Sequence, residues 1–277
     1  MDAKEAKALA DGLLSVVLAA GRLEMSHFGA GLTVERKADQ SPVTMADRQA
    51  EEIILAGLER LAPGVPVIAE ESVTSTGLPA AATRFFLVDP LDGTKGFIAG
   101  RPEFTINIAL IEDTEPIFGM LYAPALADFY ATLGPGLAVN GRLEASSAAS
   151  SLADIALATI NTRTPDRQAL VALTSQAHLH PSTQAFLDRY RVITRTALSS
   201  SLKFGWLAKG AADLYPRTGA TSEWDTAAGH ALLAAAGGTV TTMAGAPLSY
   251  GKAAAKFINP GFVAWGRASL AQGGAPA

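Results

Sequence analysis

Two aspartates stand three positions apart, at the end of an apolar run of the chain. Residues 85–88 read as a buried strand, and Asp89 and Asp92 follow it at once. The proline between them makes a rigid turn that can direct both carboxylates and the Leu91 carbonyl oxygen toward one point. Buried strands gain nothing from paired negative charges, so the pair predicts a ligand, and oxygen donors of this kind favour a hard divalent cation.

The next two residues add an anion site. Gly93 permits close approach of the backbone, and Thr94 can begin a short helix. The amides of these two residues would then face outward toward a negative group. A divalent cation between the carboxylates and a phosphate would satisfy both halves of the motif.

Further acidic residues lie at predicted element boundaries. Glu70 and Glu71 end a predicted strand, Asp225 lies at a helix start, and Asp47 lies in the first turn of another helix. Each has a structural explanation when taken alone, because helix starts and turns attract acids. Asp89 could likewise form an Asx turn.

Composition narrows the chemistry. The chain has 277 residues, a formal net charge of −4, no cysteine and four histidines. This excludes a disulfide scaffold and a thiolate site, and it disfavours a multi-histidine zinc site. No basic stripe interleaved with aromatic residues is present, which argues against a nucleic-acid polymer as partner. A metal would therefore be held by oxygen, as Mg²⁺, Mn²⁺ or Ca²⁺.

The elements that must position these residues begin with an amphipathic helix. Residues 12–21 are apolar, but Asp2, Glu5 and Asp11 do not fit a signal peptide. No apolar run reaches transmembrane length, and we expect a cytoplasmic protein.

The first half of the chain predicts two long helices and an antiparallel sheet. A second helix is expected from Thr44 to Leu61, and the expected strands are 65–71, 84–88, 103–113 and a meander that follows. Residues 133–151 are small and polar, so we expect subdomains over 1–140 and 141–277.

The second half alternates between helix and strand. The expected strands are 153–160, 190–196 and 211–217, and the expected helices are 165–178, 181–189, 200–210 and 223–238. This alternation predicts a second layered subdomain.

Four blocks together resemble the Mg²⁺-dependent, lithium-sensitive phosphomonoesterases of the inositol monophosphatase superfamily. They are "SPVTMAD" (41–47), "EES" (70–72), "DPLDGT" (89–94) and "WDTAAG" (224–229), in family order over nearly the whole chain. The resemblance implies an α+β fold, a layered αβαβα sandwich of the inositol-phosphatase and fructose-1,6-bisphosphatase type. It also allows peripheral attachment to the inner face of the cell membrane.

The chain is most similar to the CysQ-type 3′(2′),5′-bisphosphate nucleotidases. The segments that carry this resemblance are residues 89–111, 200–204, 214–217, 224–231 and 259–262. Ser200 and Lys203 are one helical turn apart and can face one ligand, and Arg217 adds a second cation at a strand end. The branch implies that these three residues contact the nucleotide and its non-scissile phosphate, whereas a structural explanation makes the two cations ordinary surface charges.

Two departures from this branch bear on specificity. Residues 162–165 read Thr-Arg-Thr-Pro where many members have a Ser-Arg-Ser-His-like stretch, and Pro165 cannot replace a histidine. Gly96 stands where the branch often has glutamate. Neither departure touches the expected metal chemistry.

The resemblance also implies the site residues and the reaction. Two or three Mg²⁺ ions, with Mn²⁺ as a substitute and Li⁺ as an inhibitor, would be bound by Glu70, Asp89, the Leu91 carbonyl, Asp92 and Asp225. Glu70 and the Asp47–Thr94 pair would orient water activated by one Mg²⁺. The phosphoryl group would contact the Gly93 and Thr94 amides and Asp225. The preferred substrate would be 3′-phosphoadenosine 5′-phosphate, converted to AMP and phosphate.

Several alternatives stay open. Inositol 1-phosphate, histidinol phosphate and sugar bisphosphates are further candidate substrates, and the protein could be a monomer or a homodimer. A haloacid-dehalogenase-type phosphatase is disfavoured, because Pro90 occupies the second aspartate position of its D-x-D-G-T motif. A phosphate-binding module without turnover is disfavoured because every expected ligand is present.

Overall fold

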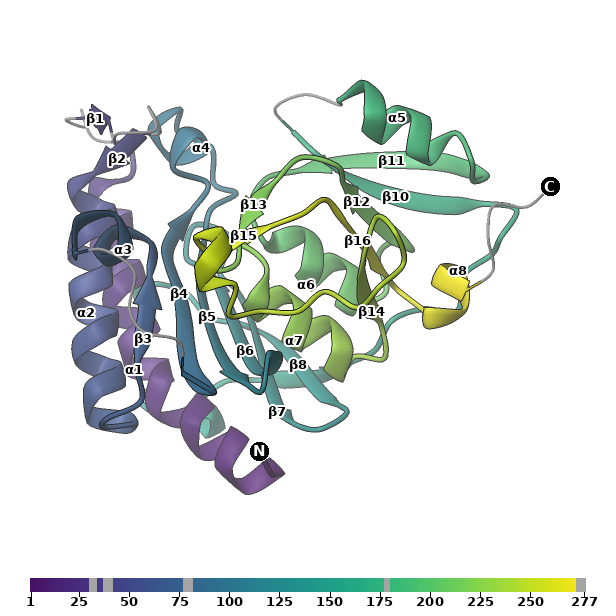
Figure 1. Cartoon of the computed structure of the whole chain (residues 1–277). Helices are drawn as coiled ribbons and strands as arrows, with labels where there is room; N and C mark the ends of the chain where they lie inside the picture. Colours follow the sequence, from purple (N-terminus) through teal and green to yellow (C-terminus); the bar gives the residue numbers. More distant parts are fainter. Residues whose placement is uncertain (30–33, 37–41, 77–81, 177–179, 273–277) are drawn as a thin grey trace.

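A seven-stranded sheet forms the centre of the first half of the chain (Figure 1). The computed structural model describes residues 1–29, 34–36, 42–76, 82–176 and 180–272. The strand order is β3-β4-β5-β6-β7-β8-β9, and only the β3–β4 pair is parallel. The strands are β3 (Val67–Ala69), β4 (Arg84–Asp92), β5 (Thr105–Glu112), β6 (Glu115–Ala123), β7 (Asp128–Gly134), β8 (Leu137–Arg142) and β9 (Leu157–Ile160).

Two long helices cover one face of this sheet. They are α1 (Ala3–His27) and α2 (Met45–Leu61), as the sequence predicted. Asp2 and Glu5 form a capping box at the start of α1, which explains the acids before its apolar stripe. The helices approach closely because Gly57 has no side chain, and a Cβ there would lie 2.5 Å from Val16. Their apolar faces and the sheet share one hydrophobic core.

The opposite face of the sheet packs on α6 (Leu202–Ala208) and α7 (Ala227–Ala235). Their side chains form a second core, which reaches from Phe85 and Leu87 of β4 to Phe262 in the other sheet. Gly119 of β6 permits this contact, since a Cβ would lie 2.1 Å from the Ala228 carbonyl oxygen. The two helices therefore form the middle layer.

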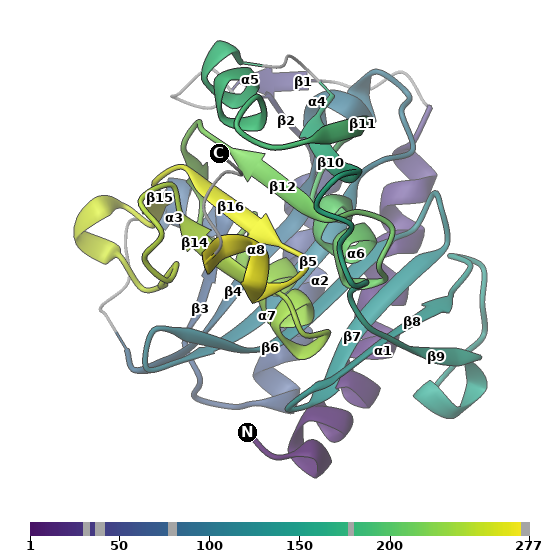
Figure 2. The same ribbon diagram turned by 90° about the vertical axis from the view of Figure 1, so that its right-hand side faces the viewer.

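A second, mixed sheet lies beyond α6 and α7, with strand order β11-β10-β12-β16-β14. Figure 2 looks onto this sheet, with the two helices behind it. The strands are β10 (Leu170–Ser175), β11 (Val192–Leu198), β12 (Leu214–Arg217), β14 (Thr239–Thr242) and β16 (Phe262–Trp265). Its outer face packs on α5 (Pro181–Leu187) and lies near α8 (Ala268–Gln272) through a third core. The order helix, sheet, helix, sheet, helix confirms the predicted αβαβα sandwich.

Short elements complete the described chain. They are β1 (Val34–Arg36), β2 (Pro42–Thr44), α3 (Glu70–Thr76), α4 (Thr94–Ile98), η1 (Leu152–Asp154), β13 (Thr221–Ser222), η2 (Ala253–Ala255) and β15 (Ile258–Asn259). None of the helices in the described residues is long and apolar enough to cross a membrane. The division into subdomains at residue 140 stays a prediction.

Several predicted boundaries are wrong. The expected helix over 165–178 contains strand β10, which is flanked by the parallel strands β11 and β12, so pairing in the sheet outweighs local helix preference. The expected strand over 65–71 ends at Ala69, and Glu70 begins α3. The helices expected over 200–210 and 223–238 are shorter, so Ser200 and Asp225 both lie before a helix.

Candidate active site

A β-bulge at the end of β4 presents the paired aspartates. Asp89 is opposite Asn107 of β5 and Asp92 is opposite Thr105, so β4 contains one extra residue. The Leu91 amide donates to Asp89 Oδ1 at 3.0 Å, so the Asx turn is real. Leu91 lies within this bulge, and Asp92 lines the pocket described below.

Gly93 lets the chain turn from the bulge into α4. Its φ is +103°, in the region that favours glycine, and a Cβ would lie 3.1 Å from the Glu103 carbonyl oxygen. Gly93 also lines the pocket. Binding of an anion by the Gly93 and Thr94 amides stays a prediction.

Asp47 and Thr94 form the hydrogen-bonded pair that the resemblance implied. Thr94 Oγ lies 3.0 Å from Asp47 Oδ1 and 3.2 Å from the Leu91 carbonyl oxygen, and its single proton can serve either acceptor. Asp47 Oδ2 accepts from the amide and the hydroxyl of Thr44, at 2.8 and 2.6 Å. Thr44 also caps α2, so one helix start fixes the carboxylate and, through it, the Thr94 hydroxyl.

Glu70 is positioned by a residue that the sequence analysis did not single out. Buried Glu51 of α2 accepts from the Glu71 amide at 2.8 Å and the Ser72 amide at 2.7 Å, and the Ser72 hydroxyl also donates to it. These are donors at the open N-terminus of α3. Glu51 therefore ties the start of α3 to α2, and Glu70 is the first residue of α3.

Asp92 and Asp225 come together across the two halves of the chain through Ser201. The Ser201 hydroxyl lies 3.0 Å from Asp92 Oδ2 and 2.6 Å from the Asp225 carbonyl oxygen. It also accepts from Asn107 Nδ2 at 2.9 Å. The block "SSLKF" drew attention to this segment, but neither Ser201 nor Asn107 was predicted as a site residue.

The carboxylates disfavour one another's charge. Burial raises the pKa of Asp92, although the positive charge of Lys203 opposes this effect. Burial raises the pKa of Asp225 well above its ordinary value, and the negative charges of Asp92 and Glu70 raise it further. Asp92 and Glu70, two other predicted ligands, thus both lie within electrostatic reach of Asp225.

The segment that carries Asp225 is fixed by a buried asparagine. Asp225 Oδ2 accepts from the Ser222 amide at 2.9 Å. Asn259 Nδ2 donates to Thr226 Oγ at 2.8 Å and to the Ser222 carbonyl oxygen at 3.1 Å. The block "NPGF", cited for the family resemblance, thus supports the Asp225 loop from the neighbouring strand β15.

A divalent cation fits the chemistry of this donor set. The donors are all oxygen, they are buried or half-buried, and positive charge would relieve the repulsion between Asp225 and its acidic neighbours. Among the residues that the structure describes, no three acidic or histidine side chains form a ready-made cation cage. The complete ligand set, Asp89 and the Leu91 carbonyl included, therefore stays a prediction.

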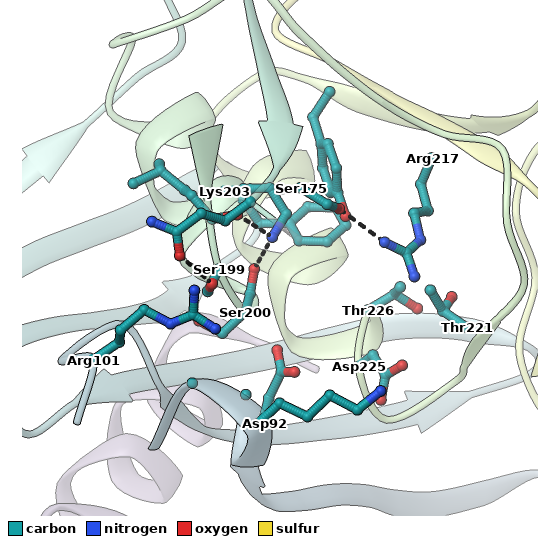
Figure 3. A pocket seen from close by; sticks show the side chains of 17 residues that line it. Asp92, Arg101, Ser175, Ser199, Ser200, Lys203, Arg217, Thr221, Asp225 and Thr226 are labelled. Atoms are coloured by element: carbon teal, nitrogen blue, oxygen red, sulfur yellow. Dashed lines mark hydrogen bonds between the residues drawn. The ribbon is translucent and has the colours of Figure 1, made fainter. Parts of the chain in front are cut away.

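Asp92, Asp225 and several cations line one pocket of about 190 Å³ (Figure 3). Lys203 is buried there and donates to the carbonyl oxygens of Leu198 at 3.2 Å and Ser200 at 2.6 Å. Burial lowers the pKa of its ammonium group to about 8. The sequence predicted that Ser200 and Lys203 share one face of a helix. This is wrong, because Ser200 has a φ of +54° and precedes α6, but both residues line the pocket.

Arg217 lies on the other side of the pocket in Figure 3. One of its terminal nitrogens donates to Ser175 Oγ at 2.8 Å. Its Nε is buried and has no hydrogen-bond partner. A surface-charge explanation therefore does not account for Lys203 or Arg217.

In the stretch 162–165, Arg163 has a structural role. Arg163 Nε donates to Asp213 Oδ1 at 2.8 Å, and Asp213 is buried and also accepts from the Val171 amide at 2.7 Å. The arginine of this stretch is thus bound to Asp213, in the segment before β12, and Asp213 in turn is bound to β10.

The sequence model of the inositol monophosphatase family matches residues 6–267. The chain belongs to this family. Two curated relatives named 3′(2′),5′-bisphosphate nucleotidase CysQ illustrate the similarity. The protein from Shigella flexneri is 40% identical over 83% of this chain and 88% of its own length, and that from Haemophilus influenzae is 31% identical over 95% and 94%.

Solved structures agree with this membership. The crystal structure of CysQ from Bacteroides thetaiotaomicron superposes with a TM-score of 0.75 and 31% identity, over 92% of this chain and 95% of that one. An inositol monophosphatase from Zymomonas mobilis gives a TM-score of 0.69 at 26% identity, over 94% and 92%. Phosphatases of this family are generally metal-dependent, which agrees with the carboxylate oxygen donors of the pocket.

Proposed function

We propose that the protein is a Mg²⁺-dependent phosphomonoesterase that hydrolyses nucleoside 3′(2′),5′-bisphosphates, with 3′-phosphoadenosine 5′-phosphate as the preferred substrate. The observation that carries this proposal is the pocket itself, in which Asp92 and Asp225, whose charges repel, face the same space as buried Lys203 and half-buried Arg217. A monophosphate leaves the cations without an anionic partner, whereas a bisphosphate supplies one phosphate to each group. The CysQ nucleotidases, at 40% identity, support this choice.

The acidic side of the pocket would hold the metal. Glu70, Asp89, Asp92, Asp225 and the Leu91 carbonyl oxygen are the proposed ligands. Two or three Mg²⁺ ions bound there would supply charge neutralisation at the phosphoryl group and a more acidic water. Mn²⁺ would substitute for Mg²⁺, and Li⁺ would inhibit by competition.

The protein side chains orient the reacting groups. When Thr94 donates to Asp47, its oxygen is left to accept a hydrogen bond from water. Glu70, at the start of α3, would accept a hydrogen bond from the same water and take up its proton as the water attacks phosphorus. Asp47 lies behind Thr94 and acts through it, while the amides of Gly93 and Thr94 would bind the phosphoryl oxygens.

The basic side would bind the second phosphate. Arg217 retains a buried Nε without a partner, and Lys203 can donate one more hydrogen bond beyond its two backbone acceptors. Each charge-assisted contact is worth about 1.5–3 kcal/mol, so losing both would cost at least about a hundredfold in selectivity.

A phosphate-release assay tests the proposal. Purified protein is given 3′-phosphoadenosine 5′-phosphate, inositol 1-phosphate or histidinol phosphate, with Mg²⁺ or with excess chelator. We expect the highest kcat/KM for the bisphosphate, no turnover in chelator and inhibition by millimolar Li⁺ but not Na⁺. Preference for inositol 1-phosphate or histidinol phosphate would contradict the substrate assignment, and binding without turnover would contradict the enzymatic one.

A further inference from the structure

Helix α4 ends in a motif that fixes Arg101 at the pocket. Gly100 has a φ of +71°, and its amide donates to the Phe97 carbonyl oxygen at 3.0 Å. The Arg101 amide donates to the Gly96 carbonyl oxygen at 2.9 Å. These two bonds define a Schellman motif, in which Arg101 follows the left-handed glycine and lies over Gly96. The backbone of Arg101 is therefore held in place by the helix end.

Gly96 leaves open the space into which this arginine extends. A Cβ on Gly96 would lie 3.7 Å from Arg101 Nε and 3.9 Å from Arg101 Cβ. In most Schellman motifs the residues at these two positions make an apolar side-chain contact. Gly96 has no side chain to make it with Arg101, and both residues line the pocket. In Figure 3, Arg101 and Arg217 extend from opposite sides of the pocket.

The guanidinium of Arg101 has unused hydrogen-bonding capacity. Within the described part of the chain, its side chain has no ion pair and no hydrogen bond, although a guanidinium carries five N–H donors. Lys203, by contrast, already donates to two carbonyl oxygens, and Arg217 donates to Ser175. Arg101 is the arginine of this pocket with its full donor set available among these residues.

We propose that Arg101 is a specificity-determining residue that binds the non-scissile phosphate of the substrate from the α4 side of the pocket. This inference rests on the proposed nucleotidase function and assigns a contact from the first half of the chain to the second phosphate. A planar guanidinium suits bidentate binding of phosphate better than an ammonium group does. Arg101 thus closes the pocket opposite Arg217 when the bisphosphate binds.

The test compares two substrates that differ only in the second phosphate. Wild type, Arg101→Ala and Arg101→Lys are assayed with 3′-phosphoadenosine 5′-phosphate and with 3′-AMP. The readout is the ratio of the two kcat/KM values. Arg101→Ala should lower this ratio by about 10- to 100-fold, mainly through KM for the bisphosphate, and Arg101→Lys should recover part of it. Arg142→Ala removes an exposed arginine outside the pocket and should keep the wild-type ratio.

Each outcome separates this inference from the proposed function. A high ratio in wild type that Arg101→Ala leaves unchanged overturns the inference alone. A ratio near one in wild type overturns the proposed function, and the inference with it. If Arg101→Ala does not fold, the variants Gly96→Glu and Gly96→Gln are compared instead. The two side chains have nearly the same size, but only glutamate places a carboxylate beside the Arg101 guanidinium. The glutamate variant should have a ratio several-fold below that of the glutamine variant, and equal ratios would overturn the inference.

Discussion

At the scale of single residues, the Ser201 hydroxyl joins the two halves of the site. It lies between the Asp92 carboxylate and the backbone of Asp225, and it is buried. Hydrogen bonds to charged groups are worth about 1.5–3 kcal/mol. We therefore expect Ser201→Ala to raise the Mg²⁺ concentration for half-maximal activity at least about tenfold, because the Asp92 carboxylate and the backbone of Asp225 lose a common anchor.

A Mg²⁺ titration of activity measures this shift. Ser15→Ala, which removes an exposed hydroxyl from α1, is the matched control. Unchanged Mg²⁺ activation of the Ser201 variant would mean that the hydroxyl does not position the ligands.

At the scale of elements, the start of α3 depends on Glu51 of α2. Glu51→Ala leaves two helix amides without their buried acceptor, so we expect a loss of about 1–3 kcal/mol in the free energy of unfolding. Activity should fall as well, because Glu70 begins this helix. Urea unfolding and phosphate release measure the two effects. The adjacent Glu52 is exposed, and Glu52→Ala should change neither; equal effects of both variants would contradict the capping role.

The same scale decides how much could be predicted from the sequence. The helices α1 and α2 have local signals, namely caps and apolar periodicity, and these were predicted well. The proline between the acids predicted a rigid turn after residue 88, whereas strand β4 continues to Asp92 through a bulge. Strand β10 has no such signal, because its identity depends on pairing with β11 and β12, which follow it in the sequence. Ser201, Asn107 and Glu51 are ordinary polar residues until the fold brings their partners near, so spacing alone could not identify them.

At the scale of the whole molecule, His230 couples stability to pH. It lies in α7, between the two sheets, with Nδ1 3.1 Å from the Tyr250 hydroxyl. Burial lowers the pKa of His230 from 6.5 to about 4. Between these values the unfolded chain binds a proton that the folded chain does not, so stability is full above pH 6.5 and falls as the pH falls toward 4. The loss reaches up to about 3 kcal/mol.

Urea unfolding at pH 7 and pH 4.5 measures the slope. His230→Phe should be less sensitive to acid than wild type, whereas His180→Asn, which changes an exposed histidine, should keep the wild-type slope. A wild-type slope in His230→Phe would assign the acid sensitivity to other groups.

Repulsion among the half-buried carboxylates predicts that activity and metal-free stability oppose one another. Asp92 and Glu70 both raise the pKa of Asp225, so the negative charge of Asp225 is costly without a cation. Asp225→Asn keeps an acceptor for the Ser222 amide and removes this charge. In chelator, this variant should melt about 2–4 °C above wild type if it gains about 1 kcal/mol. It should also have no detectable turnover.

Saturating Mg²⁺ should stabilise wild type by mass action, by about 2.7 kcal/mol at a hundred times its Kd, and should stabilise the variant much less. Glu59→Gln, which removes one exposed charge from α2, should respond to Mg²⁺ as wild type does. Equal Mg²⁺-induced shifts in Asp225→Asn and wild type would show that the metal binds elsewhere.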